Sequence, residues 1–234
     1  MPSVPTQRQN HILAALPDTD YVRLLPHLEP VSMPAEWLVY EADRPMGYLY
    51  FPTTCIISLF HVLENGASAE FAITGNEGMV GISLFMDDIS MPSTAKVQTA
   101  GNAYRLKASM LKKELALNSR LQHLGLRYIQ ILMTQMAQTA VCNRHHRLEQ
   151  RLCRWLLLHL DRLPTREMEI TQEKAANALG VRRESVTEAV GKLQTEGLIK
   201  CTRGHISVLG RTELEDRVCE CYLVQKRSCD RLLA

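Results

Sequence analysis

The sequence contains no run of about 18 apolar residues, the length that a membrane-spanning helix requires. Its first ten residues are polar and include proline, so they lack the apolar core of a secretory signal. Hydrophobic residues nevertheless make up 46% of the 234 residues, which is enough to form packed cores. We therefore expect a folded cytoplasmic protein that has no membrane partner.

The residue groupings of common enzymes are also missing. No pair of carboxylates, nucleophile with an adjacent base, or phosphate-binding loop with a lysine stands out. Some β-roll folds are enzymes that hold a metal with several histidines, but the strand-rich segment 29–106 contains only His61. The sequence therefore predicts no catalytic residues, and we expect a protein that is not an enzyme.

Cysteine is present, but not in a pattern that indicates disulfides or a metal. The number is odd, the spacing is irregular, and the spacings match no standard structural zinc motif. Reduced thiols are the default expectation without a secretion signal. The sequence thus predicts no metal ligands and no cofactor. The seven cysteines are Cys55, Cys142, Cys153, Cys201, Cys219, Cys221 and Cys229.

The most informative stretch lies in the C-terminal half. Ala176 is small enough to let two helices approach closely, and Gly180 follows four residues later in a Leu-Gly-Val turn. Only glycine easily takes the left-handed backbone that so short a turn needs. Val186 supplies the inner face of a second helix, and Thr171 is a suitable N-cap for the first. This spacing predicts a helix-turn-helix; the alternative is an ordinary helix pair with a solvated charged face.

The second helix would expose a polar face that suits DNA. Its side chains carry several hydrogen-bonding atoms of the kind that read base edges in a major groove. They are Arg182, Arg183, Glu184, Thr187 and Glu188.

A short hairpin is predicted directly after these helices. Apolar runs at 198–202 and 205–208 flank Arg203 and Gly204, and two helices followed by a two-stranded ribbon form a winged helix-turn-helix. We expect Arg203, His205 and Arg182 to contact phosphate. Residues 141–213 contain 13 Lys and Arg against 9 Asp and Glu, a positive excess typical of nucleic-acid binding.

The N-terminal half has a different texture. Short apolar runs are separated by Gly, Pro and Asn, and Asn65-Gly66 is a strong hairpin turn because both residues tolerate positive φ. Many short strands at even spacing predict a barrel or jelly roll. The expected strands are 37–40, 48–51, 55–60, 68–73, 93–100 and 102–106.

Three glycines stand between two of these strand pairs. Gly75, Gly78 and Gly81 lead into a short apolar turn, and their backbone N–H groups could cradle a ligand. The alternative is that these glycines serve only the tight turns of the roll.

Residues 121–141 predict one long helix with two apolar stripes, hence two surfaces to bury. One stripe can face the β domain of its own chain: Leu121, Leu124, Tyr128 and Ile131. The other can face a partner helix: Leu126, Ile129, Met133, Met136 and Ala140. We expect a homodimer; the alternative is a helix buried inside a monomer. The polar segment 143–146 is the expected hinge.

The order of these parts resembles the Crp/Fnr family of bacterial transcription regulators, from about residue 12 to 222. The most specific part is 179–199, LGVRRESVTEAVGKLQTEGLI, since family members carry a similar Arg-Glu-Ser/Thr-Val segment. The resemblance implies an α+β fold with a jelly-roll, cyclic-nucleotide-binding-like β-roll at 1–118, a dimerisation helix at 119–142 and a winged helix-turn-helix domain at 143–234. It also implies a sequence-specific regulator that binds double-stranded DNA as a homodimer, together with RNA polymerase.

The resemblance assigns roles to residues of the second helix. Arg183 and Glu184 match the base-reading pair of the family, so Arg183 would bind a guanine edge and Glu184 would accept from cytosine N4. Glu188 departs from the family, because better-known members place a guanine-reading arginine there. A carboxylate could instead accept from a cytosine or adenine amino group, or repel a phosphate.

The predicted effector pocket departs further. Cyclic-nucleotide-binding relatives use Gly-Glu for the ribose and Arg-Ser/Thr-Ala for the phosphate. Here Ile82 follows Gly81, and Ser93-Thr94-Ala95 lacks the arginine, a contact typically worth about 1.5–3 kcal/mol. We expect no tight binding of cyclic AMP. The pocket residues Gly78, Gly81, Ile82, Ser93 and Thr94 would hold another, unknown effector or nothing.

The alternative to an unknown effector is a regulator that responds to metal or to thiol redox chemistry. Cys142, His145, His146 and Cys153 lie near the expected hinge, and Cys219-Glu220-Cys221 adds two thiols. The histidines are equally well placed to contact phosphate, and a buried cysteine is usually a small apolar residue. The iron–sulfur branch of the family uses an N-terminal cysteine cluster, but Cys55 comes first here and stands alone.

Overall fold

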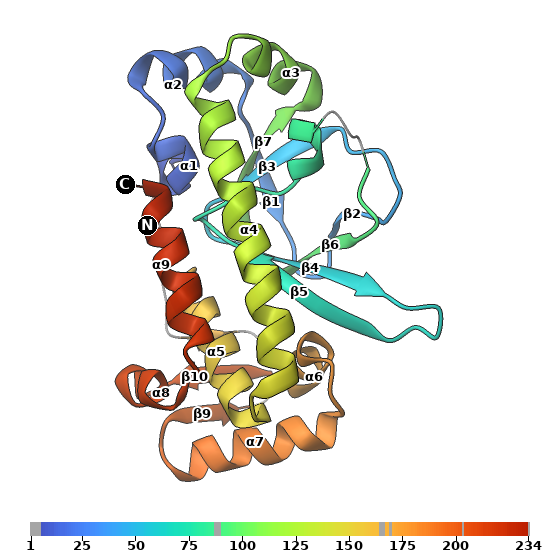
Figure 1. Cartoon of the computed structure of the whole chain (residues 1–234), viewed down its shortest axis with the longest axis vertical. Helices are drawn as coiled ribbons and strands as arrows, with labels where there is room; N and C mark the ends of the chain where they lie inside the picture. Colours follow the sequence, from blue (N-terminus) through green and yellow to red (C-terminus); the bar gives the residue numbers. More distant parts are fainter. Residues whose placement is uncertain (1–5, 87–89, 164–166, 169, 203, 234) are drawn as a thin grey trace. The chain divides into compact units, whose positions relative to one another are not determined.

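The computed structural model describes residues 6–86, 90–163, 167–168, 170–202 and 204–233 (Figure 1). The chain divides into two compact units. The first unit comprises Met1–Leu59, Ile73–Met133 and Ser228–Ala234, and the second comprises Phe60–Ala72 and Thr134–Arg227. Among the helices of the described ranges, none combines the length and apolarity needed to cross a membrane.

Two antiparallel sheets form the predicted β-roll. Their inward-facing side chains make an apolar core that includes the fully buried Phe51, Ile56 and Leu106. The first sheet has the order β1-β7-β3, with β1 at Glu29–Met33, β7 at Gly101–Lys107 and β3 at Tyr48–Pro52. The second has the order β2-β6-β4-β5, with β2 at Leu38–Tyr40, β6 at Thr94–Thr99, β4 at Ile56–Val62 and β5 at Ser68–Thr74.

The strand β1, which contains Pro30, was not among the predicted strands. In the structure β1 lies at the edge of its sheet and pairs only with β7 among the described strands. Proline is tolerated on an edge strand, where its missing N–H costs no ladder bond. The predicted turn between β4 and β5 is confirmed, with Gly66 at φ 82°.

Short helices complete the first unit. Asn10 caps α1, its Oδ1 accepting from the amides of Ile12 and Leu13, while its Nδ2 donates to the carbonyls of Pro52 and Gly78 at 2.9 and 2.8 Å. The helices are η1 at Gln7–Gln9, α1 at His11–Ala14, α2 at Asp18–Leu24, η2 at Leu25–His27, η3 at Ile82–Met86 and α3 at Ala108–Ala116.

The long helix α4 spans Arg120–His145. The stripe predicted to face its own chain is buried, with Leu121 and Leu124 at 0% exposure and Tyr128 at 1%. In the other stripe Leu126 and Met133 are exposed. The hinge expected at the polar segment 143–146 does not interrupt the helix there, because residues through His145 remain helical. Polar side chains can continue a helix where they face solvent, and Asn143, Arg144 and His145 are exposed.

The second unit contains the predicted winged helix-turn-helix. It consists of α5 at Leu148–Leu160, β8 at Glu167–Met168, α6 at Gln172–Leu179, α7 at Arg183–Thr195, β9 at Ile199–Thr202, β10 at His205–Val208, α8 at Arg211–Arg217 and α9 at Cys221–Leu233. β10 pairs with β9 as predicted and also with β8, which was not predicted and makes the sheet three-stranded. The helical segment after β10 consists of two helices, α8 and α9, with an interruption at Val218–Glu220.

A buried histidine lies in the core of the second unit. The His159 side chain in α5 is fully buried, with Nδ1 2.7 Å from the carbonyl of Trp155. Burial lowers the pKa of His159 to about 3, because the charged ring would lose its hydration.

This histidine should make stability depend on pH. The folded pKa lies below the unfolded value of about 6.5, so the contribution of neutral His159 is complete above pH 6.5 and is lost as the pH falls toward 3. Between pH 7 and 5 we expect a loss of about 2 kcal/mol. Urea unfolding at several pH values should show this decrease in the free energy of unfolding in the wild type and not in His159→Gln. An equal decrease in both proteins would contradict the assignment of this pH dependence to His159.

Candidate nucleic-acid interface

The turn between α6 and α7 has the predicted geometry. Gly180 is left-handed, with φ 64° and ψ 39°, and ends α6. The amide of Val181 then donates to the carbonyl of Ala176 at 3.0 Å, which closes the turn. At the other end of α6, Thr171 is the N-cap, its Oγ1 accepting from the amide of Lys174 at 3.2 Å. The turn and the start of α6 are therefore fixed by interactions between residues a few positions apart in the sequence.

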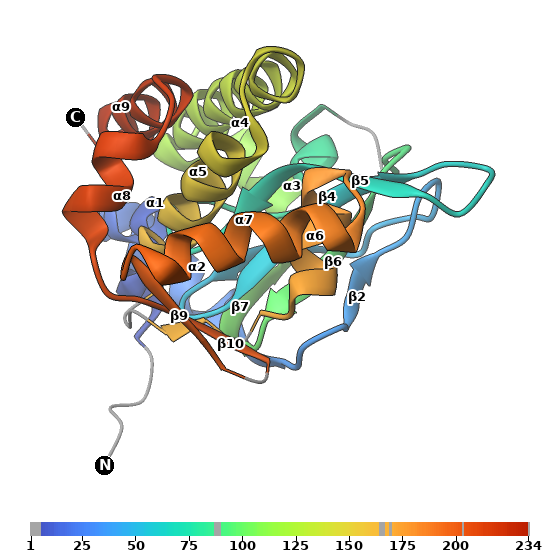
Figure 2. The same cartoon turned by 90° about the horizontal axis from the view of Figure 1, so that it is seen from below.

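The helix α7 has one buried and one exposed side. Its inner side chains are Val186, Ala189, Val190 and Leu193, all at most 3% exposed. The five polar residues predicted for the outer face are all exposed: Arg182, Arg183, Glu184, Thr187 and Glu188. In Figure 2 α7 lies at the front, beside the ribbon of β9 and β10. The arrangement presents a short row of donors and acceptors on a rigid helix.

Two residues of this row are held by neighbours. Thr187 Oγ1 lies 3.0 Å from the carbonyl of Arg183 and 2.8 Å from Oε1 of Gln172, so its single proton is engaged by acceptors. The Thr187 oxygen is thus available mainly to accept. Glu188 pairs with Lys192 at 3.2 Å, and Lys192 also pairs with Glu149 of α5 at 2.9 Å. Lys192 therefore offsets the negative charge of Glu188.

The predicted wing is present beside α7. His205 pairs with Thr202 across the hairpin and is exposed, and Gly204 in the turn has φ 80°. Arg203, the residue predicted at the tip, lies outside the described residues, as does its expected phosphate contact.

Backbone amides in the glycine segment 75–81 of the β-roll already donate hydrogen bonds to groups of the protein itself. The amide of Gly75 donates to Glu77 at 3.0 Å, that of Gly78 to the carbonyl of Gly75 at 3.2 Å, and that of Val80 to the carbonyl of Tyr50 at 2.9 Å. A Cβ on Gly78 would lie 2.2 Å from the Tyr128 ring of α4. These amides are therefore engaged in turns and pairing, and Gly78 leaves space for an aromatic side chain.

The other residues of the predicted effector pocket lie in the same first unit. Gly81 has φ 109°, a conformation that favours glycine, and Ile82 begins η3. Ser93 is buried, and its Oγ lies 3.4 Å from the Tyr40 hydroxyl, while Thr94 begins β6 and is half-buried. The structure thus pairs Ser93 with a protein hydroxyl.

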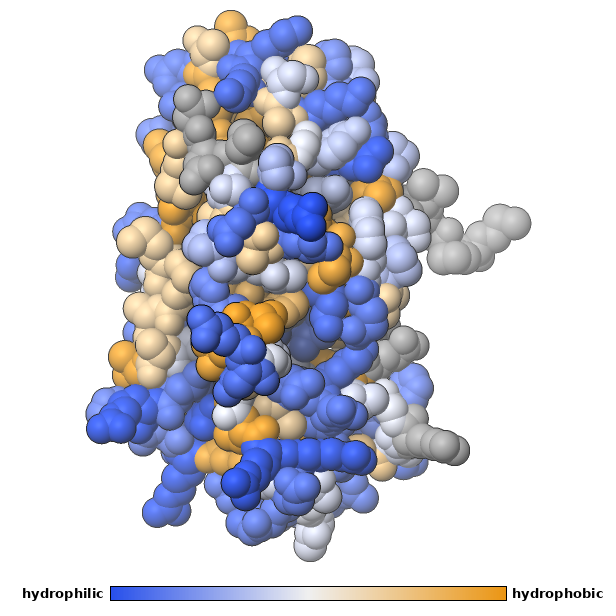
Figure 3. Space-filling view, turned by 90° about the vertical axis from the view of Figure 1, so that its right-hand side faces the viewer, coloured by the Kyte–Doolittle hydropathy of each residue, from blue (hydrophilic) through white to orange (hydrophobic). Residues whose placement is uncertain are grey.

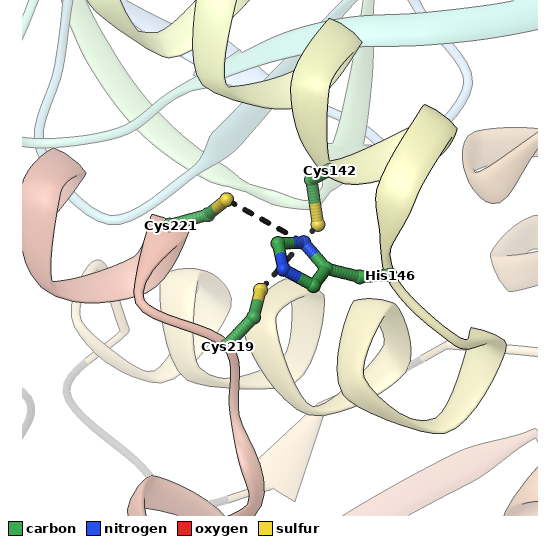
Figure 4. A group of neighbouring side chains, drawn as sticks. All are labelled: Cys142, His146, Cys219 and Cys221. Carbon is green, nitrogen blue, oxygen red and sulfur yellow. Dashed lines mark hydrogen bonds between the residues drawn. The ribbon is translucent and has the colours of Figure 1, made fainter.

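Three cysteines and one histidine of the second unit lie close together (Figure 4). Cys142 lies in the last turn of α4 and His146 directly follows that helix. They meet Cys219, between α8 and α9, and Cys221, the first residue of α9, and the ligand atoms of all four lie within 4.8 Å of one another. The Cys142 thiol lies 3.5 Å from Cys219 Sγ, and this neighbour lowers the pKa of Cys219 to about 5.

The sequence predicted no metal ligands, and all four residues were considered only in the metal or redox alternative. Two of the residues considered in the alternative, His145 and Cys153, are not among the four. The available signals were Cys-x3-His on one helix face and Cys-x-Cys far downstream. Only the fold brings segments about 75 positions apart together, so the spacing alone was not informative.

Comparisons with known proteins agree with this architecture. Residues 150–217 match the model of the Crp-like helix-turn-helix domain. FixK2 from Bradyrhizobium japonicum superposes with a TM-score of 0.71 at 17% identity, covering 82% of this chain and 98% of that protein. No curated protein sequence matches the chain.

Two further solved structures are similar. A transcriptional regulator of the Crp/Fnr family from Eubacterium rectale, described as putative, has a TM-score of 0.69 at 18% identity, covering 90% and 98% of the two chains. The c-di-GMP-responsive global regulator CLP from Xanthomonas campestris has a TM-score of 0.64 at 16% identity, covering 83% and 100%. At these identities the likeness concerns the fold.

Together these findings confirm the resemblance predicted from the sequence. The chain carries a Crp-like helix-turn-helix DNA-binding domain on the fold of Crp/Fnr transcription regulators. Proteins of this class regulate genes and are in general not enzymes. The comparisons do not favour the alternative of a metal- or redox-responsive regulator.

Proposed function

We propose that the protein is a sequence-specific transcription regulator that binds double-stranded DNA as a homodimer. One observation carries the proposal: the exposed polar row of α7 lies opposite a buried apolar row, directly after the left-handed Gly180 turn of a Crp-like domain. This arrangement fixes the orientation of the polar side chains, which is what base recognition requires.

Each outer residue of α7 has a distinct proposed role. Arg183 binds a guanine edge with both terminal nitrogens, and Glu184 accepts from the amino group of a cytosine. Thr187 acts as an acceptor, because its proton is engaged within the protein. Glu188, held by Lys192, accepts from an adenine or cytosine amino group. Phosphate is contacted by Arg182, Arg203 and His205, with Thr171 at the adjacent start of α6.

The exposed stripe of α4 supports the homodimer. Leu126 and Met133 are 53% and 60% exposed in the single chain, an unfavourable position for large apolar side chains unless another surface covers them. Hydrophilic side chains predominate on the face drawn in Figure 3, and hydrophobic ones gather along its left margin and in smaller patches elsewhere. The remaining proposed interface residues are Ile129, Met136 and Ala140. A two-fold dimer would place two copies of α7 in successive major grooves, roughly 34 Å apart.

The β-roll is proposed as a sensor domain that does not bind cyclic AMP tightly. Ile82 supplies no carboxylate for a ribose, and the amides of Gly75, Gly78 and Val80 already bond to protein. An effector of another kind would act through α4 on the angle between the two DNA-binding domains. We assign the sensor to 1–118, the dimer helix to 119–142 and the DNA-binding domain to 143–234, acting in the cytoplasm with RNA polymerase.

Arg183→Ala tests the recognition role. We expect a loss of about 1–3 kcal/mol on the preferred DNA and relaxed discrimination at one base pair, because the guanine contact is removed. Fluorescence anisotropy on matched and single-mismatch duplexes at one salt concentration measures both effects. The control is Arg227→Ala, which removes the same charge from an exposed position on α9.

The two variants separate recognition from charge. Arg227→Ala should leave discrimination unchanged and alter affinity by less than Arg183→Ala does. If Arg183→Ala lost affinity equally on matched and mismatched duplexes, Arg183 would be a phosphate contact and the assigned role would be wrong.

A further inference from the structure

We infer that Cys142, His146, Cys219 and Cys221 bind one Zn²⁺ ion that joins the end of α4 to the junction between α8 and α9. The four side chains converge from these segments in Figure 4. All four residues belong to the second unit, so the site lies within one compact body. Neither the sequence spacing nor the likeness to other regulators assigns a metal here.

The distances fit a single tetrahedral ion. Cys142 Sγ and Cys219 Sγ are 3.5 Å apart, and Cys221 Sγ is 3.7 Å from His146 Nδ1. Zinc bonds of about 2.3 Å to sulfur and 2.0–2.1 Å to nitrogen place tetrahedral ligand atoms roughly 3.5–3.8 Å apart. Small side-chain adjustments bring the remaining separations, all within 4.8 Å, to the same value.

The identity of the ligands favours zinc over other ions. Three thiolates and an imidazole are soft or borderline ligands, which select zinc over magnesium or calcium. An iron–sulfur cluster binds its cysteines through different iron atoms and therefore holds them further apart than a single ion does. Four protein ligands leave no open position, which is typical of a structural site.

Burial also fits a structural site. The exposures of Cys142, Cys219 and Cys221 are 0%, 3% and 1%, and the side chain of His146 is 14% exposed. Buried cysteines often serve as small apolar residues. Here, however, a polar ring nitrogen points into the group of thiols, which apolar packing does not explain.

The other nitrogen of His146 has a suitable partner. Its Nε2 lies 3.4 Å from Oε2 of Glu220, the residue between the two cysteines. A carboxylate at Nε2 keeps the proton on that nitrogen and leaves the Nδ1 lone pair directed toward Cys221. Zinc-binding histidines usually donate their second N–H to such a partner.

A buried arginine gives a second, independent indication. Arg154 of α5 is 4% exposed, and its described hydrogen bonds go to the neutral side chains of Thr139 and Gln225, each at 3.4 Å. Its positive charge acts electrostatically on Cys142 and Cys221. Zinc with three thiolates and one neutral histidine carries a net charge of −1, so the centre would compensate the buried guanidinium.

Metal analysis of the full chain tests this inference. Protein purified under reducing conditions without chelator is expected to contain about one zinc per chain. Cobalt(II) exchanged into the unmodified protein should give the d–d bands of tetrahedral cobalt and a thiolate-to-cobalt charge-transfer band. Absence of zinc, stoichiometric iron or copper in its place, or an octahedral cobalt spectrum would overturn the inference.

Variants locate the ion. Cys219→Ser should lower the zinc content at least tenfold, while Cys153→Ser, a control at an equally buried cysteine of the same unit, should retain it. Glu220→Gln changes a side chain that is 77% exposed, so it should fold normally and bind zinc roughly tenfold more weakly. If Cys219→Ser does not fold, the cobalt spectrum of the unmodified protein and the zinc affinity of Glu220→Gln test the site instead. Unchanged zinc affinity in Glu220→Gln or full zinc in folded Cys219→Ser would contradict the site.

Discussion

Met133→Asp is expected to convert the proposed dimer into monomers and to weaken binding to a palindromic DNA site roughly 100- to 10,000-fold. Met133 is 60% exposed on α4, so the substitution should not disturb the fold of the single chain. Two facing aspartates in an apolar seam would be desolvated and would repel each other. A monomer loses the gain in affinity that comes from linking two half-site contacts. Sedimentation equilibrium and anisotropy on the same samples measure both effects.

Val22→Asp is the matched control. Val22 is 64% exposed on α2, outside the proposed interface. This variant should remain dimeric and bind the palindrome normally. If Met133→Asp stayed dimeric with unchanged DNA affinity, the exposed stripe of α4 would not be the interface.

Gly125→Ala is expected to destabilise the protein by about 3 kcal/mol, although alanine is normally the better helix former. A Cβ on Gly125 would lie 2.2 Å from Cε1 of Phe85, so the ring of η3 and the helix α4 could not keep their positions. In a Phe85→Ala background the same change should stabilise by roughly 0.5–1 kcal/mol, because the clash is gone. Urea unfolding of the four proteins forms the double-mutant cycle.

Gly191→Ala provides the control for helix propensity. Gly191 lies in α7 with no other group near the position of a Cβ, so alanine should stabilise there by roughly 0.5–1 kcal/mol. If Gly125→Ala were destabilising even without Phe85, the close approach of that ring would not be the cause.

Local chemistry explains which features the sequence could predict. The Gly180 turn, the Thr171 cap and the Asn65-Gly66 hairpin depend on residues a few positions apart, and all three are present. The buried stripe of α4 could also be predicted, because its apolar residues, such as Leu121 and Tyr128, recur in the sequence with the helical repeat.

Features set by distant contacts were missed. The edge strand β1 tolerates Pro30 only because of its place in the sheet, and β8 exists because β10 offers it a free edge. The interruption between α8 and α9 could not be predicted from helical periodicity. It places Cys219 and Cys221 against the end of α4, so the cysteine group depends on the same undetected break.

The candidate sites followed the same division. The outer face of α7 belongs to a single helix, so the residues on it could be predicted from the helical repeat of the sequence. The environment of the glycine segment could not, because Tyr128 packs against Gly78 from 50 positions away and Tyr50 bonds to Val80 from another strand. A ligand site predicted from glycines alone does not take into account side chains and carbonyls that the fold brings to them.

The central claim is tested most directly by selecting the purified protein, without added effector, against random duplex DNA at one fixed salt concentration. We expect enrichment of a palindrome whose half-sites lie about one helical turn apart, with a guanine at the position read by Arg183. The enriched sequence would also show which base Glu188 prefers. Salt-sensitive binding with no enriched sequence would contradict the claim that this protein recognises DNA as a dimer through α7 without an effector.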